Sequence, residues 1–254
     1  MTVNINGIDT NYISEGSGNV PVLILPGWSA TSAVYSLMVK TLSETRAVCV
    51  LDLPGFGITP EPEEPWSVDD YADFVTSFIG ELGLSRVVLA GHSFGARIII
   101  KLAARENPFE IESILLVDGA GIKNPPSKKQ QKRQARFKKL KKFYSSRLVS
   151  RLFPGALAKL QKKFGSADYA AASPVMRATL VKAINEDLSP LLCKIKQKTL
   201  LIWGENDDAT PISDAYKMKA EIPDATLETI AGAGHFPFID SPFEFKRILC
   251  KYFR

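Results

Sequence analysis

The clearest chemical signal in this chain of 254 residues is the pentapeptide Gly91-His92-Ser93-Phe94-Gly95. Its serine follows a short apolar run, residues 87–90, and precedes a helix-compatible segment, residues 96–105. On a sharp, strained turn between a strand and a helix, a serine can expose its hydroxyl only where the neighbouring residues carry almost no side chain. The flanking glycines meet that condition, and the pattern therefore predicts a nucleophilic Ser93.

A serine hydroxyl is too weakly acidic to attack an ester at neutral pH unless a base removes its proton. Histidine suits this role, and the chain has two, His92 and His235. Because His92 is adjacent to Ser93, we expect its side chain to point elsewhere and interpret it as a packing or local hydrogen-bonding residue. His235 lies in a loop with small residues before it and is the predicted base; a surface or core histidine is the plainer alternative.

Such a base needs a carboxylate that fixes its tautomer and stabilises the imidazolium. We predict Asp207, which follows Trp203-Gly204-Glu205-Asn206 after an apolar run, although a simple turn aspartate is an alternative interpretation. Rival carboxylates lie close in sequence or at the end of another apolar run: Glu205, Asp208 and Asp118. Of these, Asp118 could also reach the histidine.

Attack on an ester places negative charge on the carbonyl oxygen, and two backbone N–H groups can bind that charge. Phe94, the residue after the nucleophile, supplies the first predicted donor. Trp28 supplies the second, because Gly27 lets the loop after an early apolar run turn inward. A plain turn at Pro26-Gly27 is the alternative interpretation.

Short apolar runs that alternate with helical patterns must position these residues. Two β-like segments around residues 16–18 open the chain, and the buried runs are residues 22–25, 47–53, 87–90, 114–117, 199–203 and 225–230. Helical patterns are residues 66–84, in which Ser67 and Asp70 form a capping box, 96–105 and 243–253. This alternation predicts the α/β class, with a doubly wound, mostly parallel sheet covered on both faces. The candidate residues directly follow strands, where ligands bind in such sheets.

The domain organisation follows from one long interruption. Residues 121–192 separate two predicted core strands and have helical character, which exceeds the length of an ordinary crossover. We therefore predict a core made of residues 1–120 and 193–254, with residues 121–192 as a helical cap over the strand ends.

Together these motifs resemble the α/β-hydrolase superfamily, in its capped branch of serine carboxylesterases and monoacylglycerol-lipase-like enzymes. The resemblance covers nearly the whole chain outside the cap and rests on Pro26-Gly27-Trp28, Asp52-Leu53-Pro54-Gly55-Phe56-Gly57, Gly91-His92-Ser93-Phe94-Gly95, Trp203-Gly204-Glu205-Asn206-Asp207 and Gly234-His235-Phe236-Pro237. It implies ester hydrolysis through an acyl-enzyme, without cofactor or metal, by Ser93, Asp207 and His235, with Trp28 and Phe94 as oxyanion donors. Pro26 departs from the family, which usually has histidine there.

The resemblance also leaves other activities open. The same triad serves C–C bond hydrolysis and acyl transfer in this superfamily, and the fold can act as a non-catalytic ligand receptor. The serine nucleophile argues against epoxide hydrolases and haloalkane dehalogenases, which carry an aspartate instead.

Charge is distributed unevenly along the chain. Residues 119–167 contain fifteen Lys or Arg and no acidic residue, whereas the net charge of the whole chain is +5. The plain interpretation is a solvated helix with an apolar stripe facing the entrance. The functional one is attraction of anionic partners: an acidic acyl ester, a carrier-bound acyl group, or weak contact with an anionic membrane surface. No recognition motif supports nucleic-acid binding.

Composition limits the remaining possibilities. The three cysteines, Cys49, Cys193 and Cys250, are widely spaced and are interpreted as buried free thiols. Two histidines, neither near a cysteine pair, disfavour a zinc site. The first residues do not resemble a signal peptide, and no apolar run approaches the roughly 18 residues of a membrane span. We therefore expect a soluble, cytoplasmic protein.

Overall fold

The computed structural model describes residues 1–125, 128–153, 155–156, 159–160 and 167–253. Its centre is an eight-stranded sheet with the order β1-β2-β4-β3-β5-β6-β7-β8. The strands are β1 Thr2–Ile5, β2 Ile8–Glu15, β3 Val22–Leu25, β4 Val48–Leu51, β5 Arg86–His92, β6 Glu110–Val117, β7 Thr199–Gly204 and β8 Ala225–Ile230. The β1–β2 and β2–β4 pairs are antiparallel and the other pairs are parallel, so the predicted mostly parallel sheet is confirmed.

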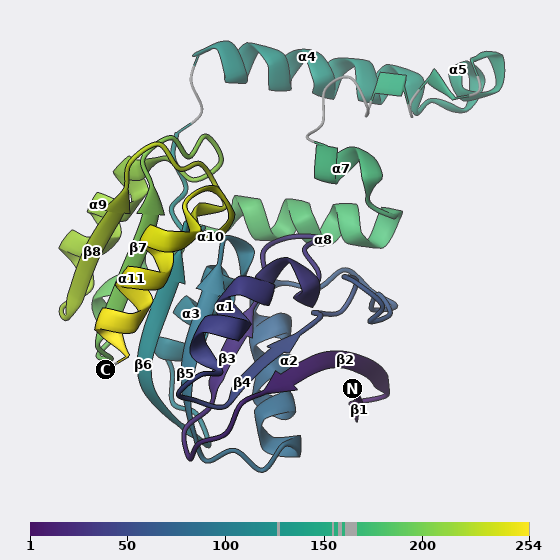
Figure 1. Cartoon of the computed structure of the whole chain (residues 1–254). Coiled ribbons are helices and arrows are strands. Elements are labelled where there is room, and N and C mark those ends of the chain that lie inside the picture. The colour runs from purple at the N-terminus through teal and green to yellow at the C-terminus, as the bar shows by residue number, and fades with distance from the viewer. Residues whose placement is uncertain (126–127, 154, 157–158, 161–166, 254) are drawn as a thin grey trace.

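The continuous apolar runs form strands because helices cover both faces of the sheet (Figure 1). In β3, Leu23 and Leu25 point into one hydrophobic core, whereas Val22 and Ile24 point into the other. All four side chains are fully buried. A strand with water on one face would alternate apolar and polar residues, and β3 does not.

Two sets of helices form the outer layers. Buried residues of α1 (Ser36–Leu42) and α11 (Pro242–Tyr252) belong to one core, and those of α2 (Val68–Glu81), α3 (Phe94–Ala103) and α9 (Ile212–Glu221) belong to the other. The predicted capping box begins α2: the Ser67 hydroxyl accepts a hydrogen bond from Asp70 N at 3.2 Å, and Ser67 N donates to Asp70 Oδ2 at 2.6 Å. This helix is shorter at both ends than predicted. The sequence analysis did not identify α1 or α9.

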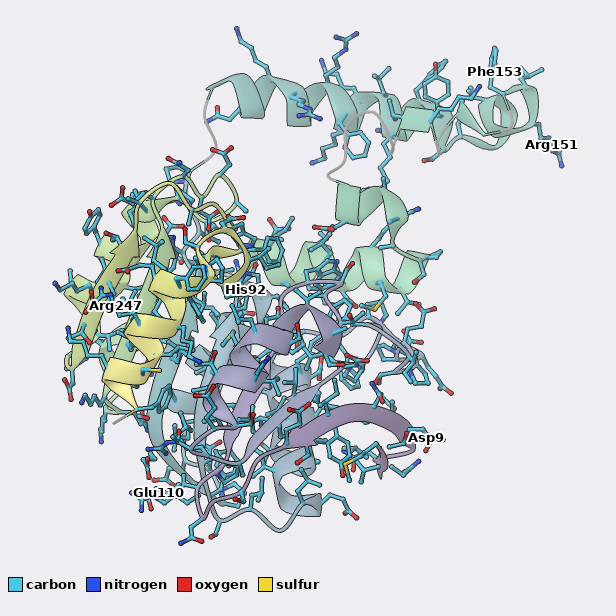
Figure 2. The ribbon with its side chains drawn as sticks, viewed as in Figure 1. Asp9, His92, Glu110, Arg151, Phe153 and Arg247 are labelled. Carbon is cyan, nitrogen blue, oxygen red and sulfur yellow. The ribbon has the colours of Figure 1, made fainter. Side chains whose placement is uncertain are left out.

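Between β6 and β7 the chain forms α4 (Lys128–Tyr144), α5 (Arg147–Leu152), α7 (Ala167–Ala171), α8 (Pro174–Asn185) and the 3-10 helix η2 (Ser189–Lys194). Figure 1 shows α8 across one end of the sheet and α4 and α5 farther out, apart from the sheet. We call α4 and α5 the arm. Figure 2 shows Arg151 and Phe153 at its far end.

The arm differs from the helix expected there. Its lysines and arginines with described side chains are exposed, as expected, and Phe137 and Leu140 are half-buried. However, the large apolar residues Phe143, Leu152 and Phe153 are 55%, 73% and 57% exposed, so they do not form a stripe packed on the entrance. The structure thus leaves apolar side chains as well as charges in water on the arm.

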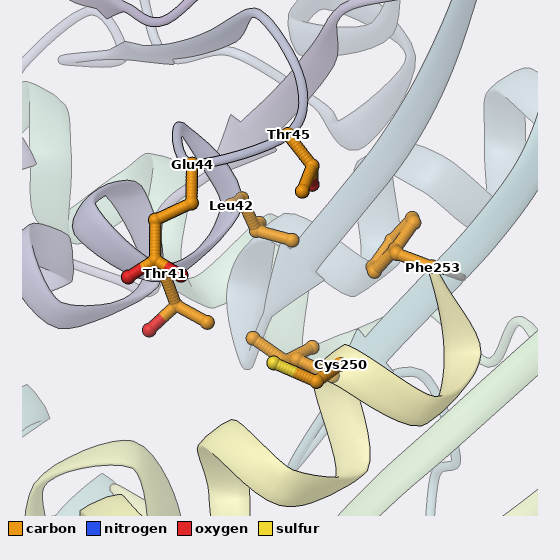
Figure 3. A pocket seen from close by; sticks show the side chains of 7 residues that line it. Thr41, Leu42, Glu44, Thr45, Cys250 and Phe253 are labelled. Atoms are coloured by element: carbon orange, nitrogen blue, oxygen red, sulfur yellow. The ribbon is translucent and has the colours of Figure 1, made fainter.

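The three cysteines are free, as predicted, but they are not all buried. Cys49 is buried in β4, whereas Cys193 is exposed on η2 and Cys250 is half-buried on α11. The Cys250 side chain lines a cavity of about 210 Å³ between α1 and α11, together with Glu44 and Phe253 (Figure 3). The prediction of buried thiols is therefore wrong for Cys193, whose short 3-10 helix lies at the surface.

Within the described part of the chain, no helix has the length and apolar character that crossing a bilayer would require.

Candidate active site

Ser93 lies on the turn between β5 and α3, where the backbone is strained. Its φ and ψ are 50° and −110°, and α3 begins with the next residue. A Cβ atom on Gly91 would come within 2.7 Å of the Ile99 side chain, and one on Gly95 would overlap the carbonyl oxygen of Leu25. The flanking glycines are needed because the turn packs directly against β3 and α3, as the pattern predicted.

One hydrogen-bonded chain joins three side chains from different loops. His235 Nε2 lies 2.9 Å from Ser93 Oγ, and His235 Nδ1 lies 2.7 Å from Asp207 Oδ2. Ser93 follows β5, Asp207 follows β7 and His235 follows β8, so parallel strands ending at one edge bring them together. The structure thus places all three predicted residues within reach of one another.

The Asp207 carboxylate is held by more than the imidazole. Thr210 Oγ1 donates to Asp207 Oδ2 at 2.6 Å, and the backbone N–H groups of Ala209 and Thr210 donate to Oδ1 at 2.7 and 3.0 Å. Burial alone would raise the pKa of Asp207, but the hydrogen bonds from His235 and Thr210 outweigh it and lower the pKa to about 2. Asp207 is therefore ionised at neutral pH and can stabilise an imidazolium.

Thr210 belongs to this hydrogen-bonded group and was not identified from the sequence. Besides Asp207, its hydroxyl contacts the Asp118 carbonyl oxygen at 3.0 Å and lies 3.5 Å from His235 Nδ1. The sequence feature that indicates this role is the position of Thr210 three residues after Asp207, where a side-chain hydroxyl can close a turn around the carboxylate.

The rival carboxylates occupy other environments. Glu205 and Asp208 are exposed, and Glu205 accepts a hydrogen bond from Thr229 at 3.0 Å. Asp118 is fully buried: its Oδ1 accepts from Gly204 N at 2.9 Å, while its Oδ2 has no partner among the described residues. Burial, aided by the negative charge of Asp207, raises the pKa of Asp118 to about 9. Asp118 is therefore a neutral acid at pH 7 and not the partner of the imidazole.

Asp118, Asp207 and His235 also form the one group of possible metal ligands found in the described residues, with ligand atoms within 4.8 Å of one another. Two of these three residues, Asp207 and His235, are hydrogen-bonded to each other in the structure.

The buried ring of His92 contacts the loop that carries His235. Its Nδ1 lies 3.0 Å from the Tyr35 hydroxyl, and its Nε2 lies 2.7 Å from the carbonyl oxygen of His235. Complete burial lowers the pKa of His92 to about 3, so the ring is neutral. The interpretation of His92 as a packing and hydrogen-bonding residue is confirmed, and the ring holds the His235 loop against the strained turn at Ser93, which we call the elbow.

Trp28 and Phe94 both lie close to the serine. A Cβ on Gly27 would lie 3.3 Å from Ser93 Cβ, so the loop that carries Trp28 passes directly beside the nucleophile. The Trp28 and Phe94 rings are in edge contact, with centroids 5.2 Å apart. Phe94 N is at the first turn of α3, where backbone N–H groups point out of the helix. Both residues therefore line the same cavity as Ser93.

A cavity of about 650 Å³ opens at Ser93. Trp28 and Phe94 form part of its wall, and α8 contributes an aliphatic surface consisting of Leu180, Ala183 and Ile184. Such a volume accommodates a small organic molecule, with the serine at one wall.

These features define a class of protein, and the comparisons agree. The family model described as alpha/beta hydrolase fold matches residues 20–242, and the chain belongs to this family. The AB hydrolase superfamily protein YisY of Bacillus subtilis is 24% identical over 263 residues, covering 96% of this chain and 95% of that protein. The pimeloyl-(acyl-carrier protein) methyl ester esterase of Nitrosomonas europaea is 28% identical over 250 residues, covering 91% and 95%.

Solved structures show the same fold. A membrane phospholipase A, described as a bacterial virulence factor, has a TM-score of 0.78 at 25% identity and covers 100% of this chain and 84% of its own. Other relatives are named as a meta-cleavage product hydrolase of Pseudomonas fluorescens and an N-formylmaleamate deformylase of Pseudomonas putida. Several of the proteins similar to this chain are thus named as hydrolases, of more than one bond type, and another is named as the dihydrolipoyllysine-residue acetyltransferase component of an acetoin cleaving system in Cupriavidus necator.

Proposed function

We propose that this chain is a serine hydrolase that cleaves carboxylic esters through an acyl-enzyme intermediate. The observation that carries the proposal is the chain of hydrogen bonds from the Ser93 hydroxyl through His235 to Asp207, with distances of 2.9 and 2.7 Å. Its serine lies on a strained turn facing a cavity, which is the arrangement that nucleophilic acyl transfer requires.

The proposed reaction has two halves. His235 accepts the Ser93 proton as the oxygen attacks the ester carbonyl, and the N–H groups of Trp28 and Phe94 bind the oxyanion. Each such donor lowers the barrier by roughly 3–4 kcal/mol. The alcohol leaves with the proton from His235, and the acyl group remains on Ser93. Water, deprotonated by His235, then attacks the acyl carbonyl, and the bond to Ser93 Oγ breaks as His235 returns the proton to that oxygen and the acid leaves. Asp207 stabilises the imidazolium in both halves.

The cavity wall formed by α8 supports assigning residues 121–192 as a cap on a core of residues 1–120 and 193–254. The alternatives are C–C bond hydrolysis or acyl transfer on the same triad, and a receptor without catalysis. Names of the relatives favour a hydrolase over a receptor, and an esterase among them spans nearly this whole chain.

A panel of nitrophenyl esters of increasing acyl length, run on the wild type and on Ser93→Ala, tests the proposal. We expect turnover that Ser93→Ala abolishes, together with labelling of Ser93 by a fluorophosphonate. A folded wild type that neither hydrolyses these esters nor is labelled would support the receptor instead.

The arm supports a proposal about partners. Its lysines and arginines with described side chains are exposed, and the surrounding sequence contains no acidic residue. Apolar side chains are exposed in the same segment. We propose that it attracts anionic partners, namely acidic esters, with weak contact to anionic membrane surfaces.

Two sets of substitutions test this role of the arm. One neutralises arm lysines (Lys138→Gln, Lys139→Gln and Lys142→Gln), and the matched control neutralises exposed lysines elsewhere (Lys194→Gln, Lys196→Gln and Lys219→Gln). We expect only the arm set to weaken sedimentation with phosphatidylglycerol vesicles and to flatten the salt dependence of turnover of anionic esters. Equal salt slopes for anionic and neutral esters in the wild type would contradict the attraction.

A further inference from the structure

A buried guanidinium lies in the same cavity as the serine. Arg97 is on the first turn of α3, four residues after Ser93, and its side chain lines the cavity of about 650 Å³ that Ser93 also lines. The residue is only 6% exposed. Ser93 directly precedes this helix, so α3 holds Arg97 one turn away from the serine.

The charge on Arg97 is not neutralised by a direct ion pair. Within the described ranges no carboxylate lies within 4.0 Å of its guanidinium, and Nη1 donates to the backbone carbonyl oxygen of Glu186 at 3.0 Å. Burial lowers the pKa of Arg97, and the charges of Glu186 and Asp187 act in the opposite direction. A guanidinium nevertheless stays protonated in a protein, so this cation is buried with most of its five donors unused by the protein.

The two neighbouring carboxylates are engaged elsewhere. Glu186 Oε1 lies 2.5 Å from Lys101 Nζ, which also contacts Asp69 at 2.8 Å. Asp187 accepts hydrogen bonds from Ser189 Oγ at 2.7 Å and from backbone N–H groups. Neither carboxylate provides Arg97 with the bidentate partner that its planar donors fit.

Two acidic side chains also line the cavity, and neither pairs with Arg97. Asp168 is exposed on α7. Asp214 accepts a hydrogen bond from Asn124 at 2.7 Å, and the charges that act on it come from Lys217 and Asp207. Buried charges are usually paired, and an unpaired one inside a ligand cavity indicates a counter-ion on the ligand.

We infer that Arg97 is a carboxylate-binding subsite, and that the substrates are anionic half-esters of dicarboxylic acids. This inference rests on the proposed ester hydrolysis at Ser93. The carboxylate at one end of the acyl chain pairs with the free donors of Arg97, while the ester carbonyl at the other end reaches Ser93. The guanidinium keeps its bond to the Glu186 carbonyl oxygen, which holds it in place.

Monomethyl and dimethyl esters of the same diacid form a matched pair that differs in one charge. We would measure kcat/KM for both, from succinate to suberate, by release of methanol in 0.5 M NaCl. That salt concentration screens exposed charges such as those of the arm but acts less on a buried pair. At the best chain length we expect the half-ester to be preferred by roughly 10- to 100-fold, as for hydrogen bonds to a charged group.

Substitutions then test whether Arg97 causes the preference for the half-ester. Arg97→Gln should abolish the preference for the half-ester through a higher KM, because its amide can donate to Glu186 but carries no charge. Arg97→Lys should keep part of it. The control is Arg105→Gln, a cation just beyond the end of α3 that pairs with Asp73 and is absent from the cavity lining, which should leave the ratio at the wild-type value.

The outcomes are separable. A wild type that hydrolyses diesters but shows no preference for the half-ester at any length overturns the subsite, and so does a preference that survives Arg97→Gln. If that variant does not fold, inhibition of diester hydrolysis in the wild type decides: hexanoate should inhibit and hexanamide should not, and equal inhibition overturns the subsite. Failure to hydrolyse either ester, without labelling of Ser93, would refute the proposed function itself.

Discussion

Replacing Asp118 by asparagine should change the pH dependence of stability far more than it changes catalysis. In the folded chain, burial raises the pKa of this carboxyl from 3.8 to about 9, so it holds a proton at neutral pH. Asparagine has nearly the same shape and is also neutral. Its side-chain oxygen can still accept the hydrogen bond from Gly204 N.

Proton linkage gives the direction and the magnitude of the expected change in the free energy of unfolding. Between pH 3.8 and about 9 the folded chain binds one more proton at this site than the unfolded chain. The contribution of this site to the free energy of unfolding of the wild type therefore falls as pH rises through that window, by about 1.4 kcal/mol per pH unit. The amide in Asp118→Asn does not titrate, so from pH 5 to pH 8 the variant should gain up to about 4 kcal/mol relative to the wild type.

Urea unfolding of both proteins at pH 5, 6.5 and 8 measures this difference, with m-values compared at each pH. Ester turnover at pH 7 is measured in parallel and should change by less than about threefold, since no charge is removed. A constant difference in stability across the three pH values would refute a proton-bearing Asp118. A loss of turnover as large as that of Asp207→Asn would show that Asp118 is the acid.

Three further expectations concern the site and the elbow. Asp207→Asn should reduce kcat by about 10⁴-fold in a nitrophenyl ester assay, because the imidazole loses its orienting carboxylate. Thr210→Val removes the 2.6 Å hydrogen bond to that carboxylate and should reduce kcat roughly tenfold, whereas Thr210→Ser should retain activity. Gly95→Ala should lower the melting temperature because its Cβ would overlap the backbone of β3, whereas Gly80→Ala, with nothing within 4 Å of its Cβ, should raise it slightly. A Gly95→Ala protein as stable as the wild type would contradict the close packing of the elbow.

The sequence predicted the strands and the triad because both depend on local patterns. Buried parallel strands need uninterrupted apolar runs, and Ser93, Asp207 and His235 each follow the end of such a run in the sequence. The small residues around Ser93 mark the strained turn in the same way. For these features, the local chemistry and the tertiary arrangement impose the same requirement.

What the sequence could not supply depends on contacts between distant segments. Asp118 and Asp207 both follow apolar runs, and only their burial and partners separate the neutral acid from the ionised one. The sequence also does not show that Arg97 lies close to the end of α8, because Glu186, its hydrogen-bond partner there, is 89 residues away in the chain. Cys193 follows two leucines in sequence, yet its side chain is exposed.

The neutrality of Asp118 also explains how two carboxylates can lie behind one imidazole. If Asp118 and Asp207 were both ionised, their negative charges would repel each other. Both could then also attract the imidazolium formed during catalysis. Burial instead keeps the proton on Asp118, while three hydrogen-bond donors and the imidazole keep Asp207 ionised. The negative charge is thereby confined to the carboxylate that contacts His235. The environment of each acid, rather than its distance from the nucleophile in sequence, decides which one serves the base.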